Sequence, residues 1–369
     1  MLNFTHMKIK DVCSELEKWA PLALQEDYDN SGLLVGDPGA EVTKVLVSLD
    51  LTPEVIGEAV EMKCQMVISH HPFIFRGLKK IIAGTPQYGI IREAVMHGIG
   101  LYAIHTNLDN SASGLNRFLC ERMGLTDLEV LSPKRGLLCK LATFCPSDHA
   151  DRVRQALFDA GAGHIGNYDS CSYNLEGFGT FRASENANPF VGERNLLHRE
   201  PEVRIEVIFP AYLEDALTSA LRASHPYEEV AYDVYPLANG MPLAGAGMIG
   251  MLENPLPAND FLEMVKERVG ISVLRHTSDS AEMIRKVAVC SGSGAFLIAD
   301  ARRSGADAYL TGDLKYHDFQ ESGSMLLADI GHYESEQWVK QLISSVLNQK
   351  FPNFAVLISE KETNPVKYL

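Results

Sequence analysis

The sequence contains no C-x-x-C pair, and its seven cysteines are odd in number and widely scattered. This argues against a disulfide framework and against a thiolate zinc site, and it fits a reducing cytosol. The chain also lacks any run of about 18 uncharged apolar residues, the length that a membrane helix needs. Its first ten residues hold no apolar core of signal-peptide length. We therefore expect a cytoplasmic protein without a membrane span.

Basic side chains are scarce: 33 Lys and Arg stand against 48 Asp and Glu, a formal net charge of −15. Such a surface repels phosphate backbones, so nucleic-acid binding is disfavoured. Hydrophobic residues make up 46% of the chain and charged residues 22%, which excludes a disordered or low-complexity protein. At about 150 residues per domain, 369 residues predict two to three domains.

The region after Lys44 alternates short buried strands with helices. Strands are predicted over 45–49, 66–69 and 101–105, and the helices between them begin at Pro53 and at about residue 87. Strands that alternate with helices in this way are typical of a parallel sheet in an α/β fold.

The same pattern returns after residue 284, with strands over 286–290 and 308–311 and a helix between them. Ser69 lies 25 residues after Lys44, and Thr311 lies 25 residues after Lys286, so the two βαβ units match at an offset of 242. We interpret this as an internal duplication split by an insertion. The second copy is predicted to continue through a strand over 325–330, a helix over 333–348 and a strand over 354–358.

The insertion has a different pattern, in the order βαββαβ of a ferredoxin-like domain. Within it, the polar stretch 183–201 is predicted to be a lid-like loop, and His225–Glu229 a structural turn. The predicted fold is thus two related α/β halves that form one metal-binding domain, interrupted by a ferredoxin-like domain. The predicted limits are 1–132 for the N-terminal half, 133–250 for the insertion and 251–369 for the C-terminal half.

Five candidate metal ligands follow strand ends of the two units. His70 and His71 end a buried strand, and Asp109 lies just beyond the next one. His332 and Glu336 are four residues apart in a predicted helix, so they share one face. Because related strand ends can face each other, we predict a site for two divalent metal ions per chain. Imidazole and carboxylate ligands suit Zn, Mn, Fe or Ni, and two adjacent ions would favour hydrolytic chemistry.

Charged groups near these residues are candidates for binding substrate and moving protons. Arg76, Lys79 and Lys80 follow the histidine pair closely enough to hold an anionic small molecule, or else they form a solvated face. His317 and Asp318 occupy in the second copy the place after the strand that the histidine pair holds in the first. They are candidate catalytic residues for proton transfer, or else they belong to a surface loop.

Several motifs together resemble the Nif-three-like family, commonly labelled GTP cyclohydrolase 1 type 2 homologues, in its long subtype with an inserted domain. The resemblance covers nearly the whole chain from about Met7, and it implies the same five dinuclear ligands. One departure is Tyr28, where the family often has Trp. The motifs are Asp29-Asn30-Ser31-Gly32-Leu33, Ser69-His70-His71-Pro72, His105-Thr106-Asn107-Leu108-Asp109, Thr311-Gly312-Asp313 and Gly331-His332-Tyr333-Glu334-Ser335-Glu336.

The inserted domain is similar to PII-like and CutA-like domains, which tend to trimerise, and family members form toroidal hexamers. The resemblance therefore implies a homohexamer. It also implies a metal-dependent hydrolase that acts on an anionic small molecule, with ring opening of the nucleotide GTP suggested by the family label. The alternative is a non-catalytic hexameric scaffold for metal binding, metal delivery or regulation.

Overall fold

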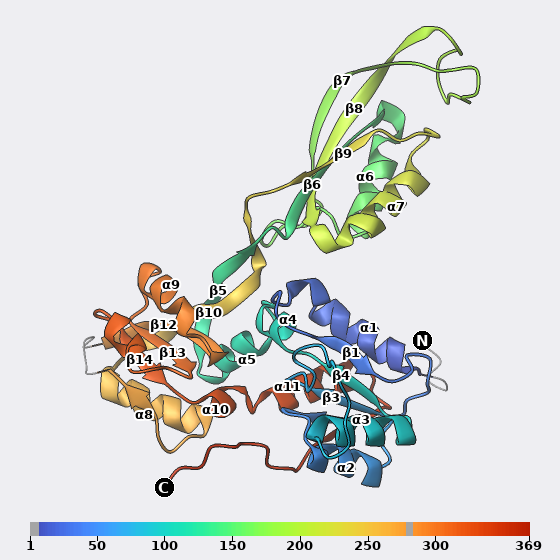
Figure 1. The fold of residues 1–369 in the computed structure, drawn as a ribbon. Helices are drawn as coiled ribbons and strands as arrows, with labels where there is room; N and C mark the ends of the chain where they lie inside the picture. Colours follow the sequence, from blue (N-terminus) through green and yellow to red (C-terminus); the bar gives the residue numbers. More distant parts are fainter. Residues whose placement is uncertain (1–6, 278–282) are drawn as a thin grey trace. The chain divides into compact units, whose positions relative to one another are not determined.

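The computed structural model describes residues 7–277 and 283–369, which fall into two compact units. The first combines Met1–Pro133 with Leu243–Leu369, and the second is Lys134–Pro242. Residues 1–6 and 278–282, which belong to the predicted N- and C-terminal halves, lie outside the described residues. Figure 1 shows the fold, which contains three sheets. No described helix is long and apolar enough to cross a membrane.

The first sheet has the strand order β1-β4-β3-β2-β15, with only β1 antiparallel to its neighbour. Alternate side chains of β2 face opposite layers of helices. Val45 and Val47 pack with α1 and α11, and Leu46 packs with α2 and α3. The elements are β1 (Gly32–Val35), β2 (Lys44–Ser48), β3 (Met66–Ser69), β4 (Gly100–Ala103), β15 (Ala355–Ile358), α1 (Ile9–Trp19), α2 (Pro53–Glu61), α3 (Pro86–His97) and α11 (Val339–Lys350).

The two crossover helices of this sheet start with the same local signal. The Thr52 hydroxyl accepts a hydrogen bond from a backbone N–H in the first turn of α2, and Thr85 does the same for α3. In each helix a proline follows the threonine, where its fixed φ suits the first turn. Gly98 ends α3 in the left-handed conformation at φ 64°.

The second sheet has the order β11-β14-β13-β12-β10-β5. Its strands β12, β13 and β14 run parallel, while β10 and β11 are antiparallel to their neighbours β12 and β14. Val287 faces α8 and Ala288 faces α9, so helices cover both sides (Figure 1). The elements are β5 (Leu125–Arg135), β10 (Gly240–Pro257), β11 (Arg275–His276), β12 (Met283–Ser293), β13 (Ala308–Gly312), β14 (Leu326–Asp329), α8 (Ala258–Val269) and α9 (Ile298–Arg303).

Strand pairing in the two sheets follows the repeat in the sequence. Val45 pairs with Met66 between β2 and β3, and Val287 pairs with Ala308 between β12 and β13. Each partner in the second pair lies 242 residues after its counterpart in the first. The two βαβ units therefore match in register as well as in spacing.

The end of each half crosses to the sheet of the other half. The prediction placed the last helix and strand in the second copy, but α11 and β15 pack in the first sheet, where β15 pairs with β2. Conversely, α5 (Leu115–Arg122) and β5 pack with the second sheet. The prediction was wrong because hydrophobic periodicity shows that an element has a buried face but does not show which sheet covers that face.

The second unit has the element order β6-α6-β7-β8-α7-β9 and one sheet, β7-β8-β6-β9, with antiparallel neighbours. Residues 173–182 form the single strand β7, and β8 begins at Leu197, inside the predicted loop 183–201. The core lies between this sheet and its two helices. The elements are β6 (Leu138–Pro146), α6 (Ala150–Asp159), β7 (Tyr173–Arg182), β8 (Leu197–Pro210), α7 (Glu214–Ser224) and β9 (Tyr232–Pro236).

Candidate metal centre

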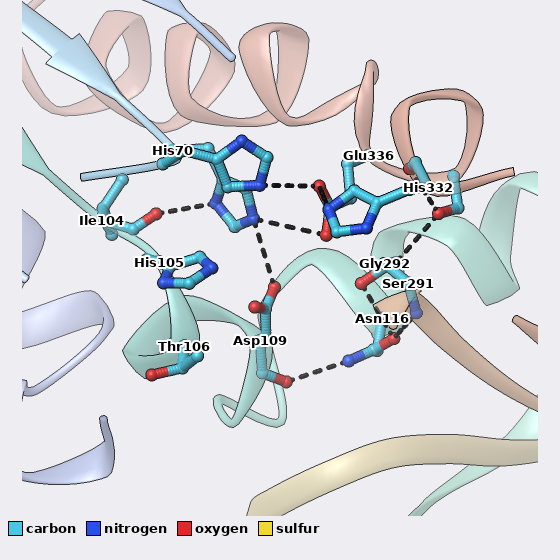
Figure 2. A network of polar contacts seen from close by, with 12 residues as sticks. His70, Ile104, His105, Thr106, Asp109, Asn116, Ser291, Gly292, His332 and Glu336 are labelled. Carbon is cyan, nitrogen blue, oxygen red and sulfur yellow. Dashed lines mark hydrogen bonds and ion pairs between the residues drawn. The ribbon is translucent and has the colours of Figure 1, made fainter. Parts of the chain in front are cut away.

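Four histidines and two carboxylates from both halves of the first unit meet at the ends of its parallel strands (Figure 2). β3 leads directly into His70 and His71, and β4 is followed by His105 and by α4 (Thr106–Asp109). From the second half, β14 leads into α10 (His332–Glu336). The carboxyl ends of parallel strands are the usual place for a site in an open α/β sheet.

His70 is completely buried and has one ring nitrogen without a hydrogen-bond partner. Its Nδ1 lies 2.7 Å from the Ile104 carbonyl oxygen, so Nδ1 carries the proton and donates. Nε2 is left with a lone pair and has no hydrogen bond. It points toward Asp109 Oδ1 at 3.6 Å and Glu336 Oε1 at 3.8 Å (Figure 2). A buried lone pair in this position is suited to a cation.

The other three histidines are each held through Nδ1 by an aspartate. Nδ1 of His71 lies 2.7 Å from Asp50, Nδ1 of His332 lies 2.7 Å from Asp313, and Nδ1 of His105 lies 2.8 Å from Asp29. An imidazole whose other nitrogen is held by a carboxylate is the usual arrangement of a metal-bound histidine. The pairs leave Nε2 of each ring available to a ligand.

Two buried carboxylate oxygens also lack hydrogen bonds. Asp109 Oδ1 has none, and neither does Glu336 Oε2, although it lies 3.0 Å from His71 Nε2 and 3.1 Å from His332 Nε2. Buried carboxylate oxygens without a partner are costly, so they require a cation or a proton. Together with His70 Nε2, they show that the residues present fit a divalent metal.

The pKa shifts reflect this crowding of charge. Burial raises the pKa of Asp109. Burial would also raise that of Glu336, but the neighbouring imidazoles of His332, His70 and His71 outweigh it and hold the pKa well below its usual range. Burial lowers the pKa of His71, yet Asp50 and Glu336 raise it to about 10. The carboxylates thus stabilise positive charge on the His71 ring.

Gly292 allows Glu336 to reach the centre. It has a φ of 63°, and a Cβ at this position would collide with the Glu336 carboxylate. The backbone N–H of Gly292 donates to Ser335 Oγ at 2.9 Å, and that of Ser291 donates to Asn116 Oδ1 at 2.8 Å. The turn therefore fixes α10 and α5 around the site.

The structure brings together all five predicted ligands and adds His105. There are two groups of donor atoms, and within each group the atoms lie within 4.8 Å of one another. The groups are His70–His71–His105 and His71–His332–Glu336. Either group could hold a metal ion, and the number of ions and their identity stay predictions. His105 was missed although it lies two residues after the end of β4, because only Asp109 was selected from that segment for its oxygen ligand.

The predicted substrate and proton-transfer residues are not part of this cluster. Arg76, Lys79 and Lys80 are exposed in the loop between β3 and α3. His317 is exposed and lies 3.4 Å from Gln320, and Asp318 accepts a hydrogen bond from the backbone of Lys315. Their roles in binding and catalysis stay predictions.

Two cavities with different linings reach the centre. One of about 390 Å³ is bounded by Asp109 and Glu336 and has the aromatic side chains of Tyr28, Phe75 and Phe296 in its lining. The other, of about 700 Å³, includes Arg275 and Tyr368 in its lining. Both also touch His71 and His332. Small molecules therefore have room beside the candidate ligands.

These features define an α/β protein with a candidate divalent-metal centre at the ends of two related sheets. The family model described as Duf34/NIF3 (NGG1p interacting factor 3) matches residues 7–365. The chain belongs to this family, as the motifs of the sequence predicted.

Relatives and solved structures support the assignment over almost the full chain. The "GTP cyclohydrolase 1 type 2 homolog" of Bacillus subtilis is 39% identical and that of Halalkalibacterium halodurans 38%, each covering 96% of both chains. A Bacillus cereus protein related to NIF3 has a crystal structure similar to this one, with a TM-score of 0.85 and 37% identity over 99% of this chain and 100% of that one. A Staphylococcus aureus structure has a TM-score of 0.76 and 32% identity, with 99% coverage of each chain.

Proposed function

We propose that the protein is a hydrolase that uses two divalent metal ions per chain and acts on an anionic small molecule. The observation that carries this proposal is the set of three buried atoms without a hydrogen bond, His70 Nε2, Asp109 Oδ1 and Glu336 Oε2, beside a cavity. The name of the curated relatives suggests GTP as the substrate, through opening of the guanine ring.

Divalent ions held here would polarise the substrate and lower the pKa of bound water toward neutrality. The candidate ligands are Asp109 and the members of the two donor groups, which are His70, His71, His105, His332 and Glu336. Glu336 directs one oxygen toward His70 and the other toward His71 and His332, so it is suited to bridge two ions. Asp50 and Asp313 hold their histidines in the tautomer that binds metal.

The smaller cavity supports a substrate with a flat aromatic part. Tyr28 and Phe75 lie with ring centroids 6.0 Å apart at its side, and both rings are more than 40% exposed. A purine can stack on such rings. In this proposal Arg76 and Lys79 or Lys80 hold the phosphates, and His317 or Asp318 moves protons.

The test combines elemental analysis with an assay of GTP turnover that detects formate. The variant is His332→Ala/Glu336→Ala. The matched control is Glu93→Ala/His97→Ala, which removes an exposed glutamate–histidine pair with the same spacing on α3. Two metals per chain and formate release that only the first variant abolishes would support the proposal. Metal without formate release would exclude GTP as substrate, and folded protein without metal would exclude the centre.

A second candidate function is a non-catalytic scaffold that binds, delivers or senses metal. The observation in its favour is that no lysine or arginine among the described residues lines the 390 Å³ cavity, so fixed charges for an anionic substrate are lacking there. Arg76→Ala and His317→Ala separate the two functions. Loss of turnover with full metal content supports the enzyme, and unchanged behaviour supports the scaffold.

We also propose a toroidal homohexamer as the working assembly. Exposed apolar side chains support it, among them Val95 and Met96 on α3, which are 68% and 62% exposed. Such side chains are typical of contact surfaces when they cluster. Light scattering coupled to size-exclusion chromatography gives the subunit number directly, and a monomer at micromolar concentration would contradict the proposal.

A further inference from the structure

The second unit contains a cavity of its own, of about 810 Å³, which is larger than either cavity at the metal centre. All its lining residues belong to Lys134–Pro242. It lies along the β7–β8 hairpin, which Figure 1 shows as a long ribbon that ends in an irregular loop. Its walls include five aromatic side chains, those of Phe144, Phe178, Phe181, Phe190 and Tyr227.

A buried carboxylate belongs to this aromatic lining. Glu202 on β8 is only 8% exposed, and one of its oxygens accepts a hydrogen bond of 2.9 Å from Tyr227 Oη. Among the described residues no lysine or arginine forms an ion pair with it, because the neighbouring Arg204 pairs with Glu206 at 2.8 Å. A buried carboxylate without a countercharge is costly, so it is a strong attraction for a cation.

Gly179 on β7 makes room for this carboxylate. A Cβ at position 179 would collide with the Glu202 carboxylate, so glycine allows Glu202 to lie against the backbone of β7. The lining as a whole is acidic, since it carries the four carboxylates of Glu176, Glu202, Glu228 and Glu229 against two guanidinium groups. These charges disfavour an anionic ligand.

The turn His225–Glu229 and the loop after β7 form one side of the cavity. The backbone N–H of Asn188 in that loop donates to Glu228 at 2.7 Å, and the Phe190 ring lies 6.2 Å from that of Tyr227. Phe181 lies at the same distance from Tyr227. Three aromatic rings thus surround the space next to the buried carboxylate.

We propose that this unit binds a small organic cation with an apolar or aromatic body. Glu202 would pair with the charged group, and the faces of Phe181, Phe190 and Tyr227 would contact both the charge and the apolar body. A bare metal ion fits less well, because hard cations take six or more oxygen ligands, whereas Glu202 is buried and the other three carboxylates of the lining are exposed. This site is chemically distinct from the metal centre and does not depend on its proposed function.

The proposal can be tested on the full chain with three indole probes that differ in charge: tryptamine, 3-methylindole and indole-3-acetate. Isothermal titration should show that the tryptamine cation binds at least about tenfold more tightly than the neutral and anionic probes, since tenfold corresponds to about 1.4 kcal/mol. Equal binding of all three probes, or no binding of tryptamine at millimolar concentration, would overturn the proposal.

Variants locate the binding. Glu202→Gln keeps an acceptor for Tyr227 but removes the charge, and it should weaken tryptamine binding about tenfold. The matched control is Glu200→Gln, a carboxylate on the same strand that already pairs with His198 and does not line the cavity. Phe181→Leu, which keeps apolar volume without the π face, should weaken binding severalfold.

An equal loss of affinity in Glu202→Gln and in its control would contradict the assignment. A change of subunit number in Glu202→Gln or Phe181→Leu, with no change in tryptamine affinity, would show that a second copy of the chain fills the cavity, and this too would overturn the proposal.

Discussion

Two buried histidines, one in each unit, show how differently the same side chain can be used. In the second unit, His225 is 8% exposed and both ring nitrogens are bonded: Nε2 to the Phe144 carbonyl at 2.9 Å and Nδ1 to the Tyr227 N–H at 3.1 Å. In the first unit, His70 is bonded only through Nδ1. The comparison shows that burial alone does not make a ligand, whereas a buried nitrogen without a partner is ready for one.

The largest expected effect is a difference in metal content between a variant of the candidate metal centre and a variant of His225. Glu336→Ala should weaken metal binding by more than about 100-fold, because even the outer partners of metal ligands contribute about 10–100-fold. His225→Ala should leave metal content unchanged. Elemental analysis after dialysis against a chelator measures both, and equal metal loss in the two variants would break the comparison.

The next effect concerns the aspartates that hold the ligand histidines. Asp50→Asn should lower metal affinity by about 10–100-fold while the ligand itself remains, because the His71 tautomer is no longer fixed. The control is Asp148→Asn, since the exposed Asp148 lies 3.0 Å from Nδ1 of His149 in the same kind of pair, outside the candidate centre. Competition with a metallochromic chelator gives the affinities, and an unaffected Asp50→Asn would argue against this orienting role.

His225→Ala should lower the stability of the second unit, whereas a change at His70 should affect metal binding in the first unit. Loss of its two hydrogen bonds leaves the Phe144 carbonyl and the Tyr227 N–H unsatisfied, at a cost of about 1–3 kcal/mol. Hydrogen exchange should accelerate in β6 and β8. Both tryptophans, Trp19 and Trp338, lie in the first unit, so unfolding followed by their fluorescence should not change. Equal effects on both signals would contradict a role confined to the second unit.

The smallest expected effect is a pH dependence in the second unit. Burial lowers the pKa of His225 below its ordinary value of 6.5, so the unfolded chain takes up a proton more readily than the folded one. The stability that the neutral ring contributes is present above pH 6.5 and is lost as the pH falls from there toward the folded pKa. The slope is at most about 1.4 kcal/mol per pH unit for one proton.

Hydrogen exchange in β6 and β8, measured between pH 5 and 7 and corrected for intrinsic rates, checks this direction. His225→Gln should flatten the dependence. A wild-type stability that rises as the pH falls through this range would show that the sign is wrong.

The sequence predicted the residues of the candidate centre better than their partners. Strand ends located His70 and His71, because parallel strands deliver such residues to one edge. Asp50 and Asp313 follow β2 and β13 at corresponding edges of the two sheets, but the sequence does not indicate which histidine each one faces. That depends on the side-chain directions of neighbouring strands, which only the assembled sheet defines.

The sequence was sufficient to predict the helices and strands and their repeat, but not which sheet each element joins. The offset of 242 correctly matched β2 and β3 to β12 and β13. It did not indicate that α11 and β15 join the first sheet. The apolar side chains of α11, such as Val339 and Leu347, could pack against either sheet as far as their hydrophobicity shows. Three-dimensional complementarity decides between two similar hydrophobic surfaces, and periodicity carries no information about it.

The exchange of α5 and α11 between the two sheets has a consequence for the order of events during synthesis. The first sheet lacks its β15 edge and part of its core until residues 339–358 have emerged from the ribosome. Glu336 emerges just before them. The sheet of the N-terminal half therefore remains incomplete while the inserted unit is synthesised. Because residues 332–358 complete both the core and the set of candidate ligands, a chain truncated before residue 332 would have neither a finished first sheet nor a complete candidate metal centre.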